Sequence, residues 1–345
     1  MEAEPRLGTV EASEQLLRDL YIELRAKIRR WAAVTKQTPQ ARMGYVGQHL
    51  VSVVTGYEGG RSGARGKDLI LSATEYAEIK TCYRIDQLGN CLTCGARVAS
   101  VESACPNCGS TDIERHDDSK WLIGFQHEDD FRILLQPKFY FLALFEFVEP
   151  PKVDAIQASI WRVDPRSPGF ALCLVDYRYN IQAKSKSGAP FNLWPYLPKF
   201  DFMRPLLIYR ARIEPDDSIK TLIFPGRDAP QPHVLKPLGE YQRSRNLSDQ
   251  SLASLAKELG MPSQIATKKS MLQTIHAFSQ SRGISNDDLV DAVARAVYGD
   301  RIRPHLAELP AELRPEIEKL LSVAQGPPKP VAPRVAMGSL PDDPV

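Results

Sequence analysis

The sequence lacks any apolar run that approaches the roughly 20 residues required by a membrane-spanning helix. Its acidic and polar stretch MEAEPRLGTVEASEQ also lacks the apolar segment of a signal peptide. Net charge is small, because 44 Lys and Arg residues stand against 42 Asp and Glu residues, for a formal charge of +2. Nucleic-acid binding would therefore depend on a local basic surface. These absences predict a soluble cytoplasmic protein that does not enter membranes.

Cysteine is scarce, and the arrangement of the six cysteines argues against a disulfide framework. Two lie alone in apolar, strand-like segments. The other four form two Cys-x-x-Cys pairs separated by ten residues, namely Cys91, Cys94, Cys105 and Cys108. Four thiolates at this spacing are typical of a closed structural zinc site of the ribbon or knuckle type. A disulfide pair or a redox motif is the competing interpretation.

The segment around these cysteines, about 90–111, contains few large apolar residues and cannot form a core of its own. Gly95 and Gly109 each follow a cysteine pair and let the backbone turn so that its amides face the thiolates. A structural zinc site contributes on the order of 10–16 kcal/mol of apparent binding free energy, which would replace the missing core. Because four protein ligands leave no open position for water, the pattern predicts a structural role for zinc.

The composition, with 43% hydrophobic and 25% charged residues, is that of a globular protein with a substantial core. A length of 345 residues favours one large domain with a smaller one. We expect the main domain over 1–230, with the zinc-binding insertion at 88–115. Short helices are expected to form a second domain over 245–325, and the proline-rich tail 326–345 is expected to be disordered.

Hydrophobic periodicity predicts a mixed α/β fold. An amphipathic helix is expected over about 12–36, from the helically spaced apolar residues Leu17, Leu20, Leu24, Ile28 and Trp31. Thr38-Pro39 predicts the start of a second helix that ends near Gly56. Apolar segments over 68–73 and 76–83 predict a β-hairpin. Later segments, including YFLALFEFV and AIQASIWRV, predict further strands, and FALCLVDYRYNI, residues 170–181, is expected to be a long strand.

The hairpin carries two carboxylates and a lysine. Residues two apart in a strand share a face, so Glu78 and Lys80 project together, while Ala77 and Ile79 face the core. Asp68 begins the preceding strand, close enough for its carboxylate to meet Glu78. Two carboxylates and a backbone carbonyl can hold Mg²⁺ with positions open for water and phosphate. Lys80 would orient or help to deprotonate the attacking water, as phosphodiester hydrolysis requires.

The alternative interpretation is a surface hairpin in which Glu78 and Lys80 form a weak exposed ion pair, since this spacing alone occurs often by chance. The neighbourhood favours the catalytic interpretation, because a glycine-rich loop precedes Asp68. The basic residues of that loop, suited to phosphate contact, are Arg61, Arg65 and Lys67.

The order of helix, TGYEGGRSGARGKDL and EIK resembles the PD-(D/E)XK nuclease core over about 44–148, which implies an α/β core with a mixed central sheet. The resemblance implies that Asp68 and Glu78 bind Mg²⁺ and that Lys80 assists catalysis, within a nuclease catalytic domain over 1–230. The cysteine insertion directly after the EIK strand resembles the type II restriction endonucleases typified by MamI.

Two departures from that pattern affect the expected site. Lys67 stands where a loosely kept proline precedes the aspartate in the superfamily. Some members add an acidic ligand from the first helix, for which the candidates here are the non-acidic Gln48 and the loop residue Glu58. That role stays unassigned.

The C-terminal helices resemble helix-extended-helix modules of the SAP and Rho N-terminal type, which bind nucleic acid. Leu252, Leu255 and Leu259 are expected to line the first helix of the pair. Lys268 and Lys269, at the second helix, would then contact phosphate. The alternative is a small helical bundle that packs against the main domain or mediates dimerisation.

These patterns together predict an endonuclease that uses Mg²⁺ to cut double-stranded DNA at a specific site, as a type II restriction enzyme does. Cutting both strands of a symmetric site would call for a homodimer. A restriction role would also imply functional pairing with a DNA methyltransferase. The alternatives are a structure-specific repair or recombination nuclease and a non-catalytic zinc-ribbon protein that binds nucleic acid.

Overall fold

The computed structural model describes residues 5–37, 44–60, 67–85, 87–99, 102–115, 119–124, 130–149, 155–184, 190–233, 248–261 and 268–322. They belong to two compact units. The first consists of Met1–His233 with His305–Ile317, and the second of Val234–Pro304 with Glu318–Val345.

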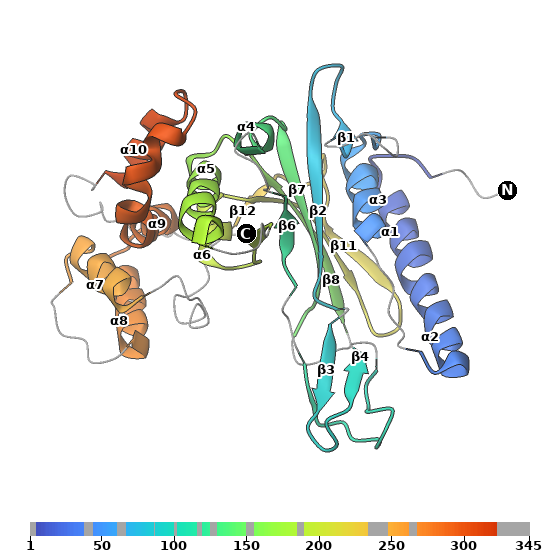
Figure 1. Ribbon diagram of the computed structural model, residues 1–345. Helices are drawn as coiled ribbons and strands as arrows, with labels where there is room; N and C mark the ends of the chain where they lie inside the picture. Colours follow the sequence, from blue (N-terminus) through green and yellow to red (C-terminus); the bar gives the residue numbers. More distant parts are fainter. Residues whose placement is uncertain are drawn as a thin grey trace, which may run out of the picture. The chain divides into compact units, whose positions relative to one another are not determined.

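The first unit is built on a seven-stranded sheet (Figure 1). Six strands follow one another in the order β1-β2-β7-β8-β10-β11, and β12 also pairs with β10. Their bounds are β1 Leu69–Ile70, β2 Tyr76–Tyr83, β7 Phe139–Phe147, β8 Ile156–Val163, β10 Leu206–Ile213, β11 Ile219–Ile223 and β12 Gln231–Pro232. The pair β2 and β7 is parallel, whereas the other pairs are antiparallel. The expectation of a mixed sheet in an α/β fold is confirmed, as is the hairpin of β1 and β2.

Helices cover both faces of this sheet (Figure 1). One face is covered by α1 Val10–Leu17, the π-helix η1 Arg18–Glu23, α2 Leu24–Thr35 and α3 Gly44–Thr55. The core on this side combines Leu17 and Leu50 from the helices with Ala77, Ile79 and Phe141 from the strands. Ala77 and Ile79 therefore face the core, as the alternation along β2 predicts. The predicted start of the second helix at Thr38-Pro39 lies outside the described residues.

The first helical segment forms where the sequence predicts it, but its expected apolar stripe is only partly buried. The buried side chains are Ala12 and a set at a spacing of four residues, namely Ser13, Leu17, Tyr21 and Arg25. A regular α-helix has 3.6 residues per turn, so residues spaced by four drift around its axis. The wider π-helical turn at η1 offsets this drift and keeps the set on one side of the helix. Leu20, Leu24 and Trp31 remain 36%, 36% and 65% exposed. The stripe expectation was therefore wrong beyond Leu17.

The expected long strand over 170–181 was also wrong, because this segment is helical. α5, Pro168–Val175, continues into the π-helix η2, Asp176–Ile181. Ser167 caps the helix by accepting a hydrogen bond from the Phe170 amide, and proline occupies its first turn. Every residue from Gly169 to Val175 is buried, so the helix shows no polar face from which periodicity could be recognised.

α5 belongs to the layer on the second face of the sheet, with α6 Pro198–Phe202 (Figure 1). Aromatic contacts join this layer to the strands. The ring centroids of Tyr140 and Phe170 lie 5.0 Å apart, and those of Trp161 and Phe200 lie 5.5 Å apart. A small two-stranded sheet, β6 Trp121–Ile123 and β9 Phe191–Leu193, and the short helix α4 Asp130–Leu134 also lie on this side, and the 3₁₀-helix η3, Gln182–Lys184, follows η2.

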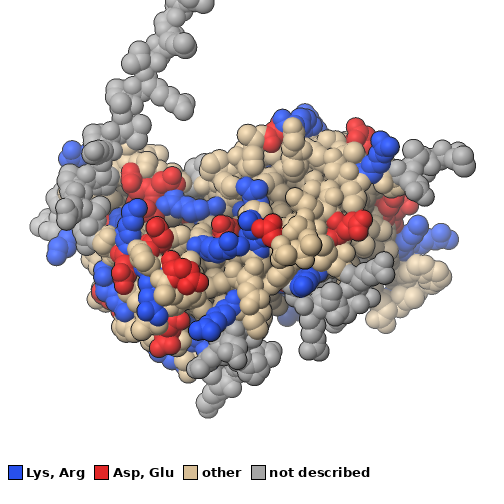
Figure 2. All heavy atoms as spheres, turned by 90° about the horizontal axis from the view of Figure 1, so that it is seen from above, with Lys and Arg blue, Asp and Glu red and all other residues tan. Residues whose placement is uncertain are grey.

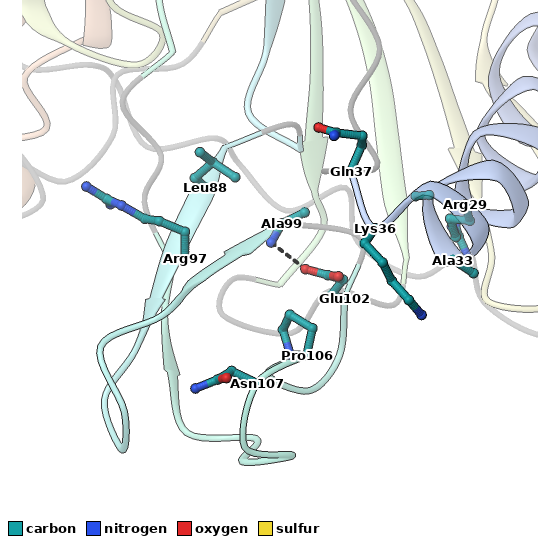
Figure 3. A pocket seen from close by; sticks show the side chains of 11 residues that line it. Arg29, Ala33, Lys36, Gln37, Leu88, Arg97, Ala99, Glu102, Pro106 and Asn107 are labelled. Atoms are coloured by element: carbon teal, nitrogen blue, oxygen red, sulfur yellow. Dashed lines mark hydrogen bonds between the residues drawn. The ribbon is translucent and has the colours of Figure 1, made fainter.

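The cysteine-containing insertion forms a separate three-stranded sheet in the order β4-β3-β5, called here the cysteine module. Its strands are β3 Leu88–Cys91, β4 Arg97–Ala99 and β5 Ile113–Glu114. Among the described residues its buried cluster is limited to Cys91, Val98 and Cys105. The end of α2 lies beside the module, with a cavity of about 660 Å³ between them (Figure 3).

The second unit is helical. Its helices are α7 Asp249–Glu258, α8 Lys268–Ser281, α9 Asn286–Ile302 and the end of α10 Arg314–Leu321. Leu252 and Leu255 on α7 and Leu259 at its C-cap are buried, as predicted. Arg295 of α9 forms an ion pair with Glu258 and also donates a hydrogen bond to the Leu320 carbonyl, one of the last carbonyls of α10.

Charges of both signs are interspersed among the side chains visible on the face shown in Figure 2. That face therefore carries no extended surface of one charge, in line with the small net charge of the chain. Among the described residues, no helix is both long and apolar enough to cross a membrane.

Helix α3 approaches β2 so closely that a side chain at Gly47 would meet Thr81. An added Cβ would lie 2.3 Å from Thr81 Oγ1 and 2.4 Å from its Cγ2. Gly47→Ala is expected to lower the free energy of unfolding by about 1–3 kcal/mol, because the neighbours must move apart. Chemical denaturation measures this loss.

Gly44→Ala, on the same helix, is the matched control, because no other group lies within 4 Å of a Cβ added at Gly44. Thr81→Ala in the Gly47→Ala background removes both close atoms and should recover part of the loss. Equal stabilities of Gly47→Ala and the wild type would contradict the close approach.

Candidate nuclease active site and metal centre

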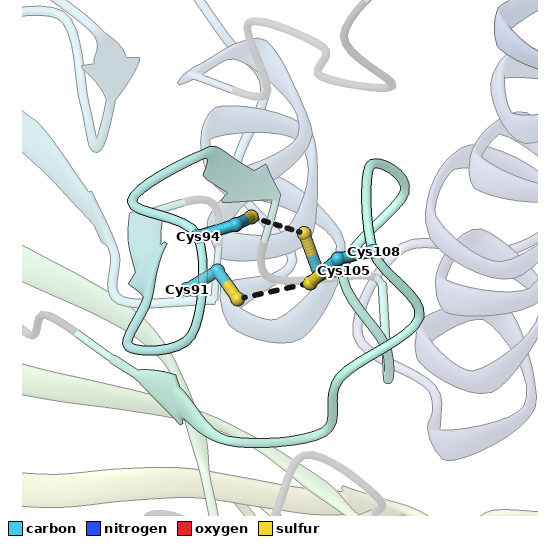
Figure 4. A group of neighbouring side chains, drawn as sticks. All are labelled: Cys91, Cys94, Cys105 and Cys108. Atoms are coloured by element: carbon cyan, nitrogen blue, oxygen red, sulfur yellow. Dashed lines mark hydrogen bonds between the residues drawn. The ribbon is translucent and has the colours of Figure 1, made fainter.

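The two cysteine pairs converge on one point (Figure 4). Their four Sγ atoms all lie within 4.8 Å of one another, and the separations of Cys91 from Cys108 and of Cys94 from Cys105 are both 3.6 Å. A tetrahedral zinc site with Zn–S bonds of about 2.3 Å requires sulfur separations of about 3.8 Å. The cluster therefore has the size that a Zn²⁺ ion would fill.

Both cysteine pairs sit in equivalent turns. The Gly95 amide donates to the Cys91 carbonyl and the Gly109 amide to the Cys105 carbonyl, each at 2.8 Å. The two glycines have φ values of +73° and +74°, a conformation that glycine adopts at no steric cost. The turns predicted from these glycines are therefore present in the structure.

Hydrogen bonds in the turns favour the thiolate forms of Cys94 and Cys91, whereas at Cys108 the neighbouring thiols outweigh the hydrogen bond from the Ser110 amide and raise the pKa to about 12. The side-chain amide of Asn107 and the backbone amide of Ala96 lower the pKa of Cys94 to about 6. Backbone amides of Cys94 and Thr93 likewise lower the pKa of Cys91, against the opposing effect of burial. Thiolate is the form of cysteine that binds metal, so the donor set suits a soft divalent cation such as Zn²⁺.

Asp68, Glu78 and Lys80 come together at the edge of the main sheet. The antiparallel register pairs Leu69 with Ala77, which places Asp68 next to Glu78. Asp68 Oδ2 accepts a hydrogen bond of 2.8 Å from the Ile79 amide. Lys80 Nζ lies 2.8 Å from Glu78 Oε2. The three residues therefore lie together, as expected from the sequence. Their catalytic role remains a proposal.

Glu78 is the most constrained of the three. Its side chain is 12% exposed, and among the described residues Oε1 is buried without a hydrogen-bond partner. Burial raises the pKa of this carboxyl, Lys80 opposes the rise, and the nearby Asp68 carboxylate adds to it. A cation at this pair of carboxylates would supply the missing partner for Oε1 and relieve the repulsion. The residues present therefore fit a hard divalent cation with oxygen ligands.

A cavity of about 440 Å³ opens beside Lys80. β1 pairs only with Tyr76 and Ala77, so no described strand pairs with this edge of β2 from Glu78 onward. The lining residues are Gly44, Tyr45, Gln48, Ile79, Lys80, Thr81, Lys120 and Leu122. The free strand edge thus gives Lys80 access to a molecule outside the sheet.

Lys120 is a basic residue of this cavity that sequence analysis missed. Its Nζ lies over the Trp194 ring at 4.6 Å from the centroid. Lys120 follows Lys80 by forty residues across the cysteine module, so no local spacing connects them. Gln48, one of two positions considered for a further ligand, also lines the cavity, whereas the other, Glu58, is exposed.

The predicted phosphate-binding residues are described only in part. Arg61 and Arg65 lie outside the described residues. Lys67 is exposed, and its Nζ lies 5.5 Å from the centroid of the Tyr76 ring. Lys268 and Lys269 begin helix α8, but their side chains lie outside the described part of the structure.

Comparison with known proteins places this chain in a family. The model of the MamI restriction endonuclease family matches residues 30–237. The chain belongs to the MamI restriction endonuclease family. The matched segment includes Asp68, Glu78, Lys80 and the cysteine module, and it ends before helix α7. Membership implies nuclease activity with DNA as substrate. No curated protein and no solved structure gave a significant match.

The raised pKa of Glu78 predicts a measurable effect on stability. A carboxyl whose pKa is higher in the folded state costs stability as the pH rises from its ordinary value of 4.5 through the raised value. Glu78→Gln removes this cost, so the metal-free variant should melt at a higher temperature than the wild type at neutral pH. Below the ordinary value the two proteins should differ less.

Added Mg²⁺ provides the second half of the same test. It should raise the melting temperature of the wild type, because a cation that binds only the folded state stabilises it. Glu78→Gln should respond much less. Equal melting curves for both proteins, with and without Mg²⁺, would contradict a cation site at Glu78.

Proposed function

We propose that this chain is a type II restriction endonuclease that hydrolyses double-stranded DNA at a specific sequence, with Mg²⁺ held by Asp68 and Glu78. The observation that carries the proposal is the unpartnered, buried Oε1 of Glu78 beside a second carboxylate, at an unpaired strand edge. The family match covers this site, and the edge is open to the cavity beside Lys80. The arrangement supports assignment to the PD-(D/E)XK superfamily.

Each residue has a distinct part in the proposed reaction. Asp68 and Glu78 would bind Mg²⁺, which when bound polarises the scissile phosphate and activates water. Asp68 is oriented by its hydrogen bond from the Ile79 amide. Lys80 is 24% exposed and faces the cavity, so its ammonium can orient water and offset the negative charge that develops on the phosphate.

The cysteine module holds Zn²⁺ in this proposal, bound by Cys91, Cys94, Cys105 and Cys108. Four thiolate ligands leave no site for substrate, so zinc stabilises the module and takes no part in hydrolysis. Reduced thiols are consistent with a cytoplasmic enzyme.

The proposed organisation assigns catalysis to 1–230 and a helical domain to 245–325. Lys268 and Lys269 of that domain would contact DNA phosphates in a SAP-like manner, with dimerisation as the alternative role of the helices. A two-fold homodimer would place one active site on each strand of a symmetric sequence. Pairing with a methyltransferase of the same specificity would protect the host DNA.

Incubation of the purified protein with plasmid DNA and Mg²⁺ tests the proposal. Discrete fragments whose ends map to one sequence are expected, with no products when Mg²⁺ is withheld. Cleavage restricted to branched DNA would instead indicate a structure-specific repair or recombination nuclease. Binding to DNA without cleavage of any substrate would indicate a non-catalytic zinc-ribbon protein.

A further inference from the structure

A groove of about 660 Å³ lies between the end of α2 and the cysteine module (Figure 3). It is separate from the cavity beside Lys80, with which it shares no lining residue. One wall comes from α2 and the residues that follow it, and the other from β3, β4 and the turn of the second cysteine pair. The lining residues are Arg29, Ala32, Ala33, Lys36, Gln37, Leu88, Arg97, Ala99, Glu102, Pro106 and Asn107.

The groove has an excess of positive charge, with three basic residues against one carboxylate. The carboxylate of Glu102 is already engaged, since its Oε2 accepts a hydrogen bond of 2.8 Å from the Ala99 amide. Within the described part of the chain, neither Arg29 nor Lys36 forms an ion pair, and both side chains are exposed. Arg97 lies at the rim with its side chain pointing away from α2 (Figure 3), and its Nη1 donates to Asn90 Oδ1 at 2.7 Å.

The charge excess extends beyond the groove. From Leu24 to Tyr57 the sequence has six Lys and Arg residues and no Asp or Glu, although the whole chain has a net charge of only +2. Arg25 is buried over the Tyr21 ring and Lys27 pairs with Glu23. The remaining described basic side chains of this stretch are exposed, namely Arg29, Arg30 and Lys36. A local surface of this kind complements a polyanion.

The groove is also within reach of a duplex that occupies the active site. Leu88, at the groove, follows Lys80 by eight residues. Even fully extended, this chain spans at most about 29 Å. A DNA duplex rises about 3.4 Å per base pair, so this limit corresponds to about eight base pairs. The two places are therefore close enough for one duplex of that length to span the distance between them.

We propose that this groove binds the phosphodiester backbone of the DNA duplex, several base pairs from the scissile phosphate, through Arg29 and Lys36 with Arg97 at its rim. The inference rests on the proposed function and adds a second contact surface for the same substrate. It also gives the cysteine module a role, because the module supplies one wall of the groove.

The test compares two variants that each remove two exposed positive charges. Arg29→Gln/Lys36→Gln alters the groove, whereas Arg166→Gln/Lys220→Gln is the matched control outside both cavities. Binding to a 30-base-pair duplex of mixed sequence is measured over a range of salt concentrations without Mg²⁺. Each lost phosphate contact reduces the magnitude of the slope of log K against log salt concentration by about 0.9. The slope of the groove variant should therefore be less steep than that of the wild type by about 2, and the slope of the control should be unchanged.

Measurements of cleavage kinetics and of the oligomeric state in solution distinguish this inference from the function on which it rests. The groove variant should keep its kcat at saturating DNA and show a raised KM, with Arg97→Gln acting in the same direction. If the groove variant still cleaves DNA and its binding has the salt dependence of the wild type, the groove does not bind the DNA backbone, while the proposed function stands. A change in oligomeric state without a change in DNA binding would overturn it in favour of contact between copies. A wild type that neither binds nor cuts DNA would overturn both.

Discussion

Lys80→Ala should reduce the rate of DNA cleavage by about 10²–10⁴-fold, the usual contribution of a positioned proton-transfer or charge-stabilising group. The Lys80 ammonium lies 2.8 Å from Glu78 and faces the cavity at the free edge of β2. Its loss removes a cation next to the proposed scissile phosphate, but the carboxylates and the surrounding DNA contacts remain. Single-turnover cleavage with saturating enzyme measures the chemical step.

DNA binding by Lys80→Ala should stay within a few-fold of the wild type, because many contacts share the affinity for a duplex. Lys220→Ala is the control, since Lys220 is an exposed lysine on β11 outside both cavities. It should cleave at the wild-type rate. Unchanged cleavage by Lys80→Ala would remove this residue from the mechanism, and equal losses in binding and cleavage would assign it to substrate affinity alone.

Cys91→Ser should abolish stoichiometric zinc binding and unfold the cysteine module. Few apolar side chains support this module, whose described buried cluster is Cys91, Val98 and Cys105. The metal would therefore supply most of its stability, and structural zinc contributes on the order of 10–16 kcal/mol of apparent binding free energy. We expect one zinc per wild-type chain by elemental analysis and rapid proteolysis between residues 88 and 115 in the variant.

Cys173→Ala is the matched control for this experiment. Cys173 is fully buried in α5, outside the cluster, and burial raises the pKa of its thiol to about 12. The control should retain one zinc and a protease-resistant module, even if the cavity left by the missing sulfur lowers its overall stability. A wild-type protein that contains no metal and still resists proteolysis at the module would refute the four-thiolate site.

Local spacing allowed several parts of the structure to be predicted from the sequence. The two Cys-x-x-Cys turns depend on glycine conformation and on contacts between near neighbours, so the convergence of the cysteines followed from their order. The strand period places Glu78 and Lys80 on the face opposite Ala77 and Ile79, which are both buried. Local contacts of the same kind begin helix α9, where Ser285 Oγ accepts a hydrogen bond from the Asp288 amide three residues later.

Burial was harder to predict, because it depends on what the fold brings against each segment. Residues 170–181 read as a strand since the helix α5 is apolar on all sides and loses its helical period. Trp31 continues an apolar stripe in the sequence, yet it is 65% exposed, since no described element covers that part of α2. Neither result can be inferred from composition or period alone.

The sequence by itself determined the elements whose information is local: the cysteine turns, the hairpin and the shared face of Glu78 and Lys80. Only the tertiary structure decided which distant segments meet. It brings Lys120 to the cavity beside Lys80, leaves Glu78 Oε1 buried without a partner, and sets Arg29 and Lys36 opposite the cysteine module. The physical reason is that these arrangements follow from sheet register and helix packing, which join residues far apart in the chain.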